Sequence, residues 1–234
     1  LRGGKHMMNT TIYLASVEPL WDEGIYNRLY EMSSNARKAK TDRFRFRKDK
    51  ILSVGAEALL RHALRELGIP WEEPVYSYGE NMKPYLAWQE GIFFNISHAG
   101  EYVMLAVSDA EVGCDIEKIG PVSPGVARLT LSPEERQRLA ACDEAGKELL
   151  FCRYWVLKES YLKATGEGLY RDPASLRIEL DSPAYVVRDG APQEYGFWEG
   201  DSLPGYRMAV CRAGDYRESL CGGWIFENTI EEFD

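Results

Sequence analysis

Two acidic residues alternate within the segment "GCDIEKI", residues 113–119. On a β-strand, residues i and i+2 share a face, so Asp115 and Glu117 project to one side and Cys114 to the other. Neighbouring carboxylates repel unless a proton or a cation lies between them, and Mg²⁺ is typically held by one or two carboxylates together with substrate phosphates. The pair therefore indicates a magnesium site, although a half-buried strand that merely exposes its acids gives the same alternation.

The segment "WVLKESYLK", residues 155–163, carries a second set of charges on a predicted helix. At about 100° per residue, Trp155, Glu159 and Lys163 fall within one arc. Lys158 lies at the edge of that arc. An exposed ion pair between residues i and i+4 is the ordinary explanation of this spacing. The neighbouring aromatic rings of Phe151 and Trp155 instead favour a cleft for these charges.

Basic residues gather in one part of a chain whose net charge is −9. Between positions 37 and 50 there are two acids and eight basic residues: Arg37, Lys38, Lys40, Arg43, Arg45, Arg47, Lys48 and Lys50. Such a segment in an acidic protein indicates a small polyanion such as a nucleotide, although a solvated face gives the same run. Ser97 and His98 end a predicted strand, where a histidine is more often structural than catalytic. Lys83 precedes Pro84, which favours an extended backbone.

The composition excludes several classes of protein. The 234 residues are 45% apolar and 28% charged, as in globular proteins. No run approaches the length of about 20 apolar residues that a membrane helix needs, and the negative charge argues against general nucleic-acid binding. The five cysteines form neither a C-x-x-C motif nor a disulfide framework, so we expect a reducing cytoplasm. Residues 1–7, "LRGGKHM", read as a tag or cloning remnant.

Known phosphate-binding and nucleophile signatures are missing from the sequence, so phosphate binding must depend on side-chain cations. The predicted elements are, in order, a strand at 11–17, polar helical residues to about 48, a helix at 48–70 closed by Gly68, three strands within 91–119, a break at 120–125, a helix capped by Ser132, a helix at 147–165 and further strands. The three central strands have short connections and predict a meander. Helices plus an antiparallel sheet in each half predict an α+β fold.

The ordered set of charged segments resembles a known family. "GCDIE" followed by "WVLKESYLK" resembles the paired signatures of 4′-phosphopantetheinyl transferases, and "FNISHAGEYVMLAVS", "KPYL" and "DRFRFRKDK" resemble the Sfp type of that family. The similarity extends from about Ile12 to Phe226. It implies two similar α+β halves with pseudo-twofold symmetry, residues 8–112 and 113–234, and an active site at their interface.

The resemblance also implies roles for individual residues. Asp115, Glu117 and Glu159 match the acids that hold Mg²⁺ on the pyrophosphate of coenzyme A, and Lys163 would reach a phosphate. Either Glu159 or a metal-bound water would take the proton of the accepting serine. The positions that match coenzyme A contacts are Arg37, Lys40, Ser53, Lys83, Pro84, Ser97, His98, Lys158 and Lys163. Met82 departs from the family pattern, in which glycine is usual before the lysine.

The implied reaction moves the 4′-phosphopantetheine arm of coenzyme A to a serine hydroxyl of an apo acyl or peptidyl carrier protein and releases 3′,5′-ADP. We expect a cytoplasmic monomer without nucleic-acid or membrane partners, and secondary-metabolite carriers of polyketide or nonribosomal peptide synthesis. Residues 126–139, with Arg128, Arg136 and Arg138, are the predicted surface for an acidic carrier. Two alternatives are a catalytically silent coenzyme A-binding module, which would not need three metal-binding acids, and another Mg²⁺-dependent enzyme acting on nucleotides, such as a phosphohydrolase.

Overall fold

Helices and strands follow one another along the whole described chain. The computed structural model describes residues 10–69, 76–214 and 225–229, so the predicted remnant at residues 1–7 lies outside the described residues. The helices are α1 (Glu23–Met32), α2 (Asn35–Asp42), α3 (Arg47–Glu66), α4 (Pro124–Thr130), α5 (Pro133–Ala140) and α6 (Glu144–Thr165), with short 3₁₀ helices η1 (Glu18–Trp21), η2 (Glu80–Met82), η3 (Gly168–Tyr170) and η4 (Pro173–Ser175). None of the helices in these ranges is long and apolar enough to cross a membrane.

The strands form two main sheets. They are β1 (Thr11–Ser16), β2 (Tyr76–Tyr78), β3 (Pro84–Leu86), β4 (Phe93–Ala99), β5 (Tyr102–Ser108), β6 (Val112–Lys118), β7 (Arg177–Glu179), β8 (Tyr185–Arg188), β9 (Ala191–Pro192), β10 (Tyr195–Gly200), β11 (Tyr206–Ala213) and β12 (Ile225–Thr229). One main sheet has the order β12-β1-β5-β4, and the other has the order β10-β11-β6. Antiparallel pairing packed with helices confirms the predicted α+β class.

The predicted three-stranded meander is wrong at its third strand. β4 and β5 pair as expected, but β6 pairs with β11 in the second sheet. Both edges of β5 are occupied, by β1 and by β4, so β6 has no free edge of β5 to join. Short connections indicate which strands are close in sequence, and they do not decide which edges remain open.

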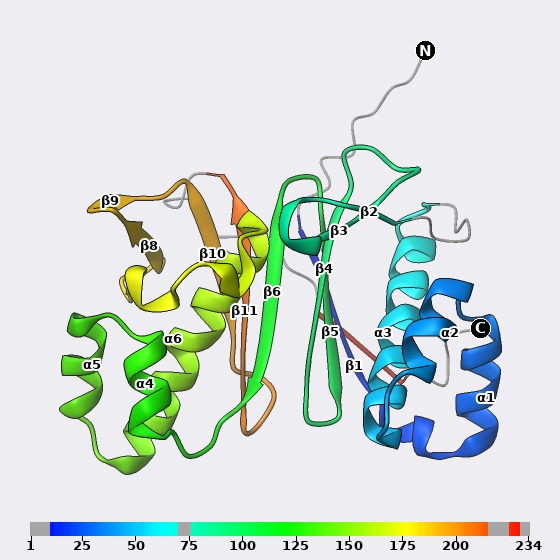
Figure 1. The fold of residues 1–234 in the computed structure, drawn as a ribbon, viewed down its shortest axis with the longest axis horizontal. Coiled ribbons are helices and arrows are strands. Elements are labelled where there is room, and N and C mark those ends of the chain that lie inside the picture. Colours follow the sequence, from blue (N-terminus) through cyan, green and yellow to red (C-terminus); the bar gives the residue numbers. More distant parts are fainter. Residues whose placement is uncertain (1–9, 70–75, 215–224, 230–234) are drawn as a thin grey trace.

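Apolar side chains fill the space between the two sheets. Ile12 and Leu14 of β1 lie in one buried cluster with Cys114 and Ile116 of β6. The alternate residues of β1, including Tyr13, face a second cluster that α3 covers. In Figure 1 the sheets lie side by side, with α1–α3 beyond the first and α4–α6 beyond the second. Strands buried on both faces read as continuous apolar runs, which explains the composition of β1 and β5.

The last described strand returns to the first sheet. β12 pairs in parallel with β1, from Ile12 opposite Ile225 to Ser16 opposite Thr229. The predicted second half, residues 113–234, therefore does not keep all its strands in its own sheet. The strand-like pattern around residues 225–227 predicts a strand and does not specify which sheet edge that strand joins.

A loop before β3 holds a non-glycine residue in the left-handed backbone region. Met82 has a φ of +64°, and its side chain is 69% exposed. The left-handed conformation costs a residue with a Cβ roughly 1–2 kcal/mol. The loop thus keeps the conformation that suits glycine although methionine stands there.

Replacing Met82 with glycine should raise the free energy of unfolding by about 0.5–1 kcal/mol, because relief of the left-handed strain exceeds the added flexibility of the unfolded chain. Urea unfolding measures this change. A matched control is Leu149→Gly, at an exposed position of α6, which should lower stability by about 1 kcal/mol. Equal losses in the two variants would contradict the interpretation.

Candidate active site

Helix α6 packs along strand β6, and this contact forms the seam on which the charged residues lie. A glycine makes the approach possible: a Cβ at Gly113 would overlap the Ser160 carbonyl oxygen and the Ala164 nitrogen. The side chains of β6 that face α6 include Asp115 and Glu117, which project as the sequence predicts. Close packing therefore brings the two acidic segments of the sequence together.

Lys163 and Asp115 are joined directly across this seam. Lys163 Nζ lies 2.6 Å from Asp115 Oδ1, and the aspartate side chain is only 4% exposed. Ser97 Oγ donates a hydrogen bond of 2.8 Å to the same oxygen and accepts one of 3.1 Å from Lys163 Nζ. About two helical turns before Lys163 on α6, Trp155 Nε1 donates a hydrogen bond to Glu117 Oε1 at 3.2 Å. Residues from β4, β6 and α6 thus form one connected polar site.

The carboxylates of this site disfavour one another's ionisation. Burial raises the pKa of Glu117, and the nearby Asp115 carboxylate raises it further. Burial also raises the pKa of Glu159. Lys163 opposes that shift, whereas Asp115 and Glu117 add to it. Burial acts to lower the pKa of Lys163, but Asp115, Cys114 and Glu159 together outweigh this effect and the pKa is raised overall. The site therefore has more negative charge than Lys163 alone can neutralise.

The carboxylate oxygens of this site are of the kind that a divalent cation binds. Asp115 Oδ2 and Glu159 Oε1 are buried and have no hydrogen-bond partner within the described part of the chain. A buried carboxylate oxygen without a partner is costly unless a cation compensates it. Across residues 10–69, 76–214 and 225–229, however, no three His, Cys, Asp or Glu side chains are gathered closely enough to hold a metal as they stand. Lys163 is the present counter-charge of Asp115, which a metal ion would have to displace.

An open cavity lies on the N-terminal side of this seam. It has a volume of about 360 Å³ and lies between α2, α3, β3 and β4. Its lining includes five residues that the sequence predicts as coenzyme contacts: Arg37, Lys40, Ser53, Pro84 and His98. Tyr76 and Tyr78 add aromatic rings. Since His98 follows Ser97 in β4, the cavity and the acidic site are adjacent along one strand.

Positive charge is concentrated in this cavity. Burial lowers the pKa of Lys40, and neighbouring Arg37 lowers it further. Burial likewise lowers the pKa of His98, with contributions from Lys163 and Lys40. Arg37 is fixed by a 3.0 Å ion pair between its Nε and Glu57 Oε2. Cations that disfavour one another and line an open cavity are suited to an anionic ligand.

Two of the predicted coenzyme contacts lie elsewhere. The side chain of Lys158 is fully buried and pairs with Glu135, on a side of α6 away from the seam. Lys83 is 4% exposed at its side chain, and its Nζ contacts Glu111 and the carbonyl oxygens of Val112 and Ala164. Only its neighbours Met82 and Pro84 line the cavity. The structure therefore does not place either lysine in contact with a ligand there.

Comparisons with known proteins agree with the motifs. Residues 111–211 match the model of the 4′-phosphopantetheinyl transferase superfamily, and residues 23–110 match that of the N-terminal part of 4′-phosphopantetheinyl transferases. The 4′-phosphopantetheinyl transferase psf-1 of Bacillus pumilus is 30% identical over 208 residues, which cover 86% of this chain and 88% of that protein. The chain belongs to the 4′-phosphopantetheinyl transferase superfamily. Further members are similar: gsp of Aneurinibacillus migulanus, 31% identical over 81% of this chain and 80% of its own, and Sfp of Bacillus subtilis strain 168, 30% identical over 82% and 88%.

As a phosphopantetheinyl transferase, the protein is an enzyme that moves the phosphopantetheine arm of coenzyme A to carrier proteins. The predicted family, the enzyme class and the transfer of the arm from coenzyme A to carrier proteins are thereby confirmed. Motif matching alone misses two residues that shape the transferase site. Asn95 Oδ1 accepts the Cys114 amide hydrogen at 2.9 Å, which joins β4 of the first sheet to β6 of the second. Glu57, 1% exposed within the apolar face of α3, could have been noticed as a lone acid that requires a partner.

Proposed function

We propose that the enzyme transfers the arm in an Mg²⁺-dependent reaction to a serine hydroxyl of an apo carrier protein and releases 3′,5′-ADP. The observation that carries this proposal is the meeting of Asp115, Glu117, Glu159 and Lys163 on one seam, beside a cavity lined with cations. A cluster of carboxylates in excess of its lysine, beside a cavity lined with several cations, is complementary to a magnesium-bound pyrophosphate.

The coenzyme would lie across both parts of the site. Arg37, Lys40 and His98 are suited to its 3′-phosphate because all three line the same cavity. Ser53 and Pro84 line the same cavity and are available to its adenosine part. The pyrophosphate would then reach the seam, where Asp115, Glu117 and Glu159 would hold Mg²⁺. The bound ion supplies charge neutralisation for the reacting phosphates.

His98 should couple nucleotide binding to proton uptake. Its pKa is lowered by burial and by Lys163 and Lys40, so the free enzyme has mainly neutral His98 at pH 7. A bound phosphate favours the charged imidazole and raises that pKa. The affinity for 3′,5′-ADP should therefore increase as pH falls between the raised and the lowered pKa, by at most about tenfold per pH unit. Calorimetry from pH 5.5 to 8, in buffers of differing ionisation enthalpy, measures this proton uptake. The His98→Gln variant controls for titration of the nucleotide itself, and an identical pH profile in the variant would contradict the prediction.

The chain's own residues would serve the transfer step as follows. Glu159 takes the proton from the serine hydroxyl, for which its raised pKa is suited. The serine oxygen forms a bond to the β-phosphorus of coenzyme A as the bond from that phosphorus to the bridging oxygen breaks. 3′,5′-ADP leaves with the bridging oxygen, and the Lys163 ammonium offsets the charge that develops on it. Positioning and charge neutralisation thus do most of the work.

The carrier protein would dock on α4. Val126 and Leu129 on this helix are 46% and 67% exposed. Arg128 is exposed beside them and can meet an acidic carrier. Arg136 and Arg138, which the sequence also suggests for this role, already bond to the Leu131 carbonyl oxygen and to Glu179. We therefore narrow the proposed surface from residues 126–139 to α4.

Leu129→Asp should raise KM for an acidic carrier by about tenfold through lost apolar contact and charge repulsion, with KM for coenzyme A unchanged. Steady-state transfer kinetics measure both constants. Leu149→Asp is the matched control, because this leucine is 39% exposed on α6 and lines a different groove. Equal effects of the two variants on the carrier would contradict docking on α4.

Mass spectrometry of the product tests the proposed function. The enzyme is mixed with an apo carrier, coenzyme A and MgCl₂, and the carrier should gain the mass of one phosphopantetheine arm on its serine. Parallel reactions with fatty-acid, polyketide and nonribosomal peptide carriers define the carrier class, and EDTA should abolish the gain. No gain on any carrier would refute the proposal.

We also propose a cytoplasmic monomer. The described cysteines Cys114, Cys142, Cys152 and Cys211 are all free thiols, which suits a reducing compartment. Residues of both parts of the proposed site come from one chain, so a second copy is not required. Sedimentation at the concentration used for kinetics tests the oligomeric state.

A further inference from the structure

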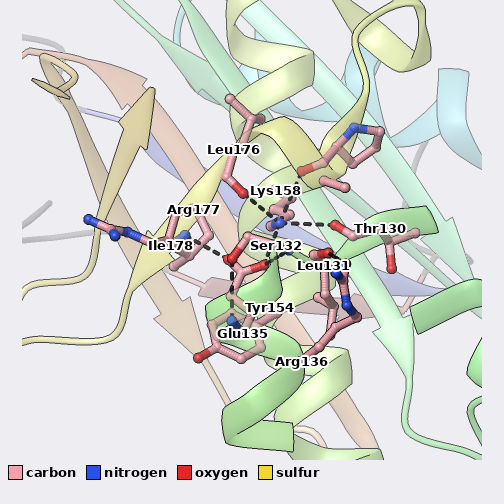
Figure 2. Close-up of polar contacts among 12 residues, drawn as sticks. Thr130, Leu131, Ser132, Glu135, Arg136, Tyr154, Lys158, Leu176, Arg177 and Ile178 are labelled. Atoms are coloured by element: carbon pink, nitrogen blue, oxygen red, sulfur yellow. Dashed lines mark hydrogen bonds and ion pairs between the residues drawn. The ribbon is translucent and has the colours of Figure 1, made fainter. Parts of the chain in front are cut away.

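The ammonium group of Lys158 lies in a cage of oxygen atoms inside the C-terminal half, as Figure 2 shows. Its Nζ is 2.5 Å from Glu135 Oε2. It also donates hydrogen bonds to the carbonyl oxygens of Thr130 at 2.9 Å, Leu176 at 2.8 Å and Pro173 at 3.0 Å. The side chains of the lysine and the glutamate are 0% and 1% exposed. Neither is therefore available to a ligand.

The oxygens of this cage come from separate segments of the chain. Thr130 is the last residue of α4, and Glu135 lies in the first turn of α5. Pro173 and Leu176 belong to η4 and the residue after it. Glu135 extends the network, because its two carboxylate oxygens accept the amide hydrogens of Ser132 and Ile178 at 2.7 Å each. One lysine on α6 thus holds together α4, α5 and the entrance of β7.

Stability alone does not account for this ion pair. Well-packed apolar residues are often as stable as a buried pair or more stable, because both charges lose their hydration. The pair adds a geometric restraint, because each of the surrounding oxygens must lie at a bonding distance from the same ammonium group. The segments around it therefore have one arrangement relative to α6.

We propose that Lys158 and Glu135 are positioning residues that hold the carrier-docking helix α4 in register with the catalytic residue Glu159. Lys158 immediately precedes Glu159 on α6, and its ammonium bonds the last carbonyl of α4. The docked serine would therefore reach the acidic site only while this contact fixes α4. The inference rests on the proposed function, in which the carrier binds α4.

The double variant Lys158→Met/Glu135→Gln tests the inference without leaving a single buried charge. We expect KM for the carrier to rise about tenfold, while KM for coenzyme A and the Kd of 3′,5′-ADP stay within about twofold of wild type. The matched control is Arg153→Met/Glu199→Gln, which removes an ion pair of 2.6 Å between the same helix α6 and β10. It should change neither KM. A fall in kcat with both KM values unchanged would show a merely structural role and overturn the inference.

Hydrogen–deuterium exchange supplies a readout that does not depend on transfer. Amides of residues 125–131 should exchange at least about tenfold faster in the double variant Lys158→Met/Glu135→Gln, while amides of residues 155–163 keep their protection. Unchanged exchange in α4 would overturn the inference. Absence of transfer by the wild-type enzyme would instead refute the proposed function, so the two failures are distinguishable.

Discussion

Replacing Glu159 with glutamine should reduce transfer by about 10³-fold while the fold is retained, because the variant loses both a metal-binding carboxylate and the base for the serine proton. The thermal midpoint of the metal-free protein should not fall. Glu159 has a raised pKa in the folded state, so its ionisation destabilises the fold as pH rises from the ordinary carboxyl pKa through the raised one. A glutamine cannot ionise, and above this window the variant should be the more stable protein.

The same variant separates catalysis from folding. MgCl₂ should raise the thermal midpoint of the wild-type enzyme and should have a smaller effect on Glu159→Gln. Glu144→Gln is the matched control, since its exposed carboxylate lies at the start of the same helix, 88% exposed. Retained transfer by Glu159→Gln, with the control behaving as wild type, would exclude both roles of Glu159.

Lys163→Met should reduce transfer by about 10²-fold and should lower the stability of the metal-free protein by about 3 kcal/mol. The first effect comes from the lost charge at the leaving phosphate. The second comes from Asp115, whose side chain is 4% exposed and would lose the ammonium 2.6 Å away. Chemical denaturation and steady-state kinetics measure the two effects separately.

Magnesium should have opposite consequences for the two variants. Lys163 competes with a cation for Asp115, so its removal should increase the stabilisation that MgCl₂ gives, in contrast to Glu159→Gln. Lys147→Met, at a surface ion pair near the start of α6, serves as the control and should change neither stability nor transfer appreciably. If MgCl₂ stabilised Lys163→Met no more than the wild type, Lys163 would not be the competing counter-charge.

The sequence predicts those parts of the site whose positions follow from the repeat of a single strand or a single helix. Alternation on β6 correctly places Asp115 and Glu117 on one face, and the helical arc correctly brings Lys163 to them. Lys158 lies at the edge of that arc. The residues that contact its side chain therefore depend on which segments pack against α6, and the helical repeat does not specify them. Because α6 is buried on several sides, the lysine faces Glu135, an acid that the sequence identifies only as part of a helix cap.

The remaining errors of the sequence-based prediction concern residues whose contacts lie far away along the chain. β6 pairs with β11, from which α4–α6 and β7–β10 separate it along the chain, and no local signal specifies that edge. Lys83 precedes a proline next to the coenzyme cavity, yet its stem follows the seam to Ala164 at the end of α6. The family pattern marks Lys83 as a site residue. Only the structure shows that its ammonium bonds to backbone carbonyl oxygens.

The parallel pairing of β12 with β1 has a consequence for biosynthesis. β1 precedes the other described helices and strands in the chain, whereas its partner, Ile225–Thr229, follows all of them and is translated last among them. Until then one edge of β1 has unpaired amide and carbonyl groups, which other chains can join. The half of the molecule that is synthesised first thus cannot complete its sheet until the last described strand arrives. A stalled or shortened chain that lacks β12 leaves this edge of β1 unpaired and open to pairing with other chains. Chaperones would have to shield that edge during translation.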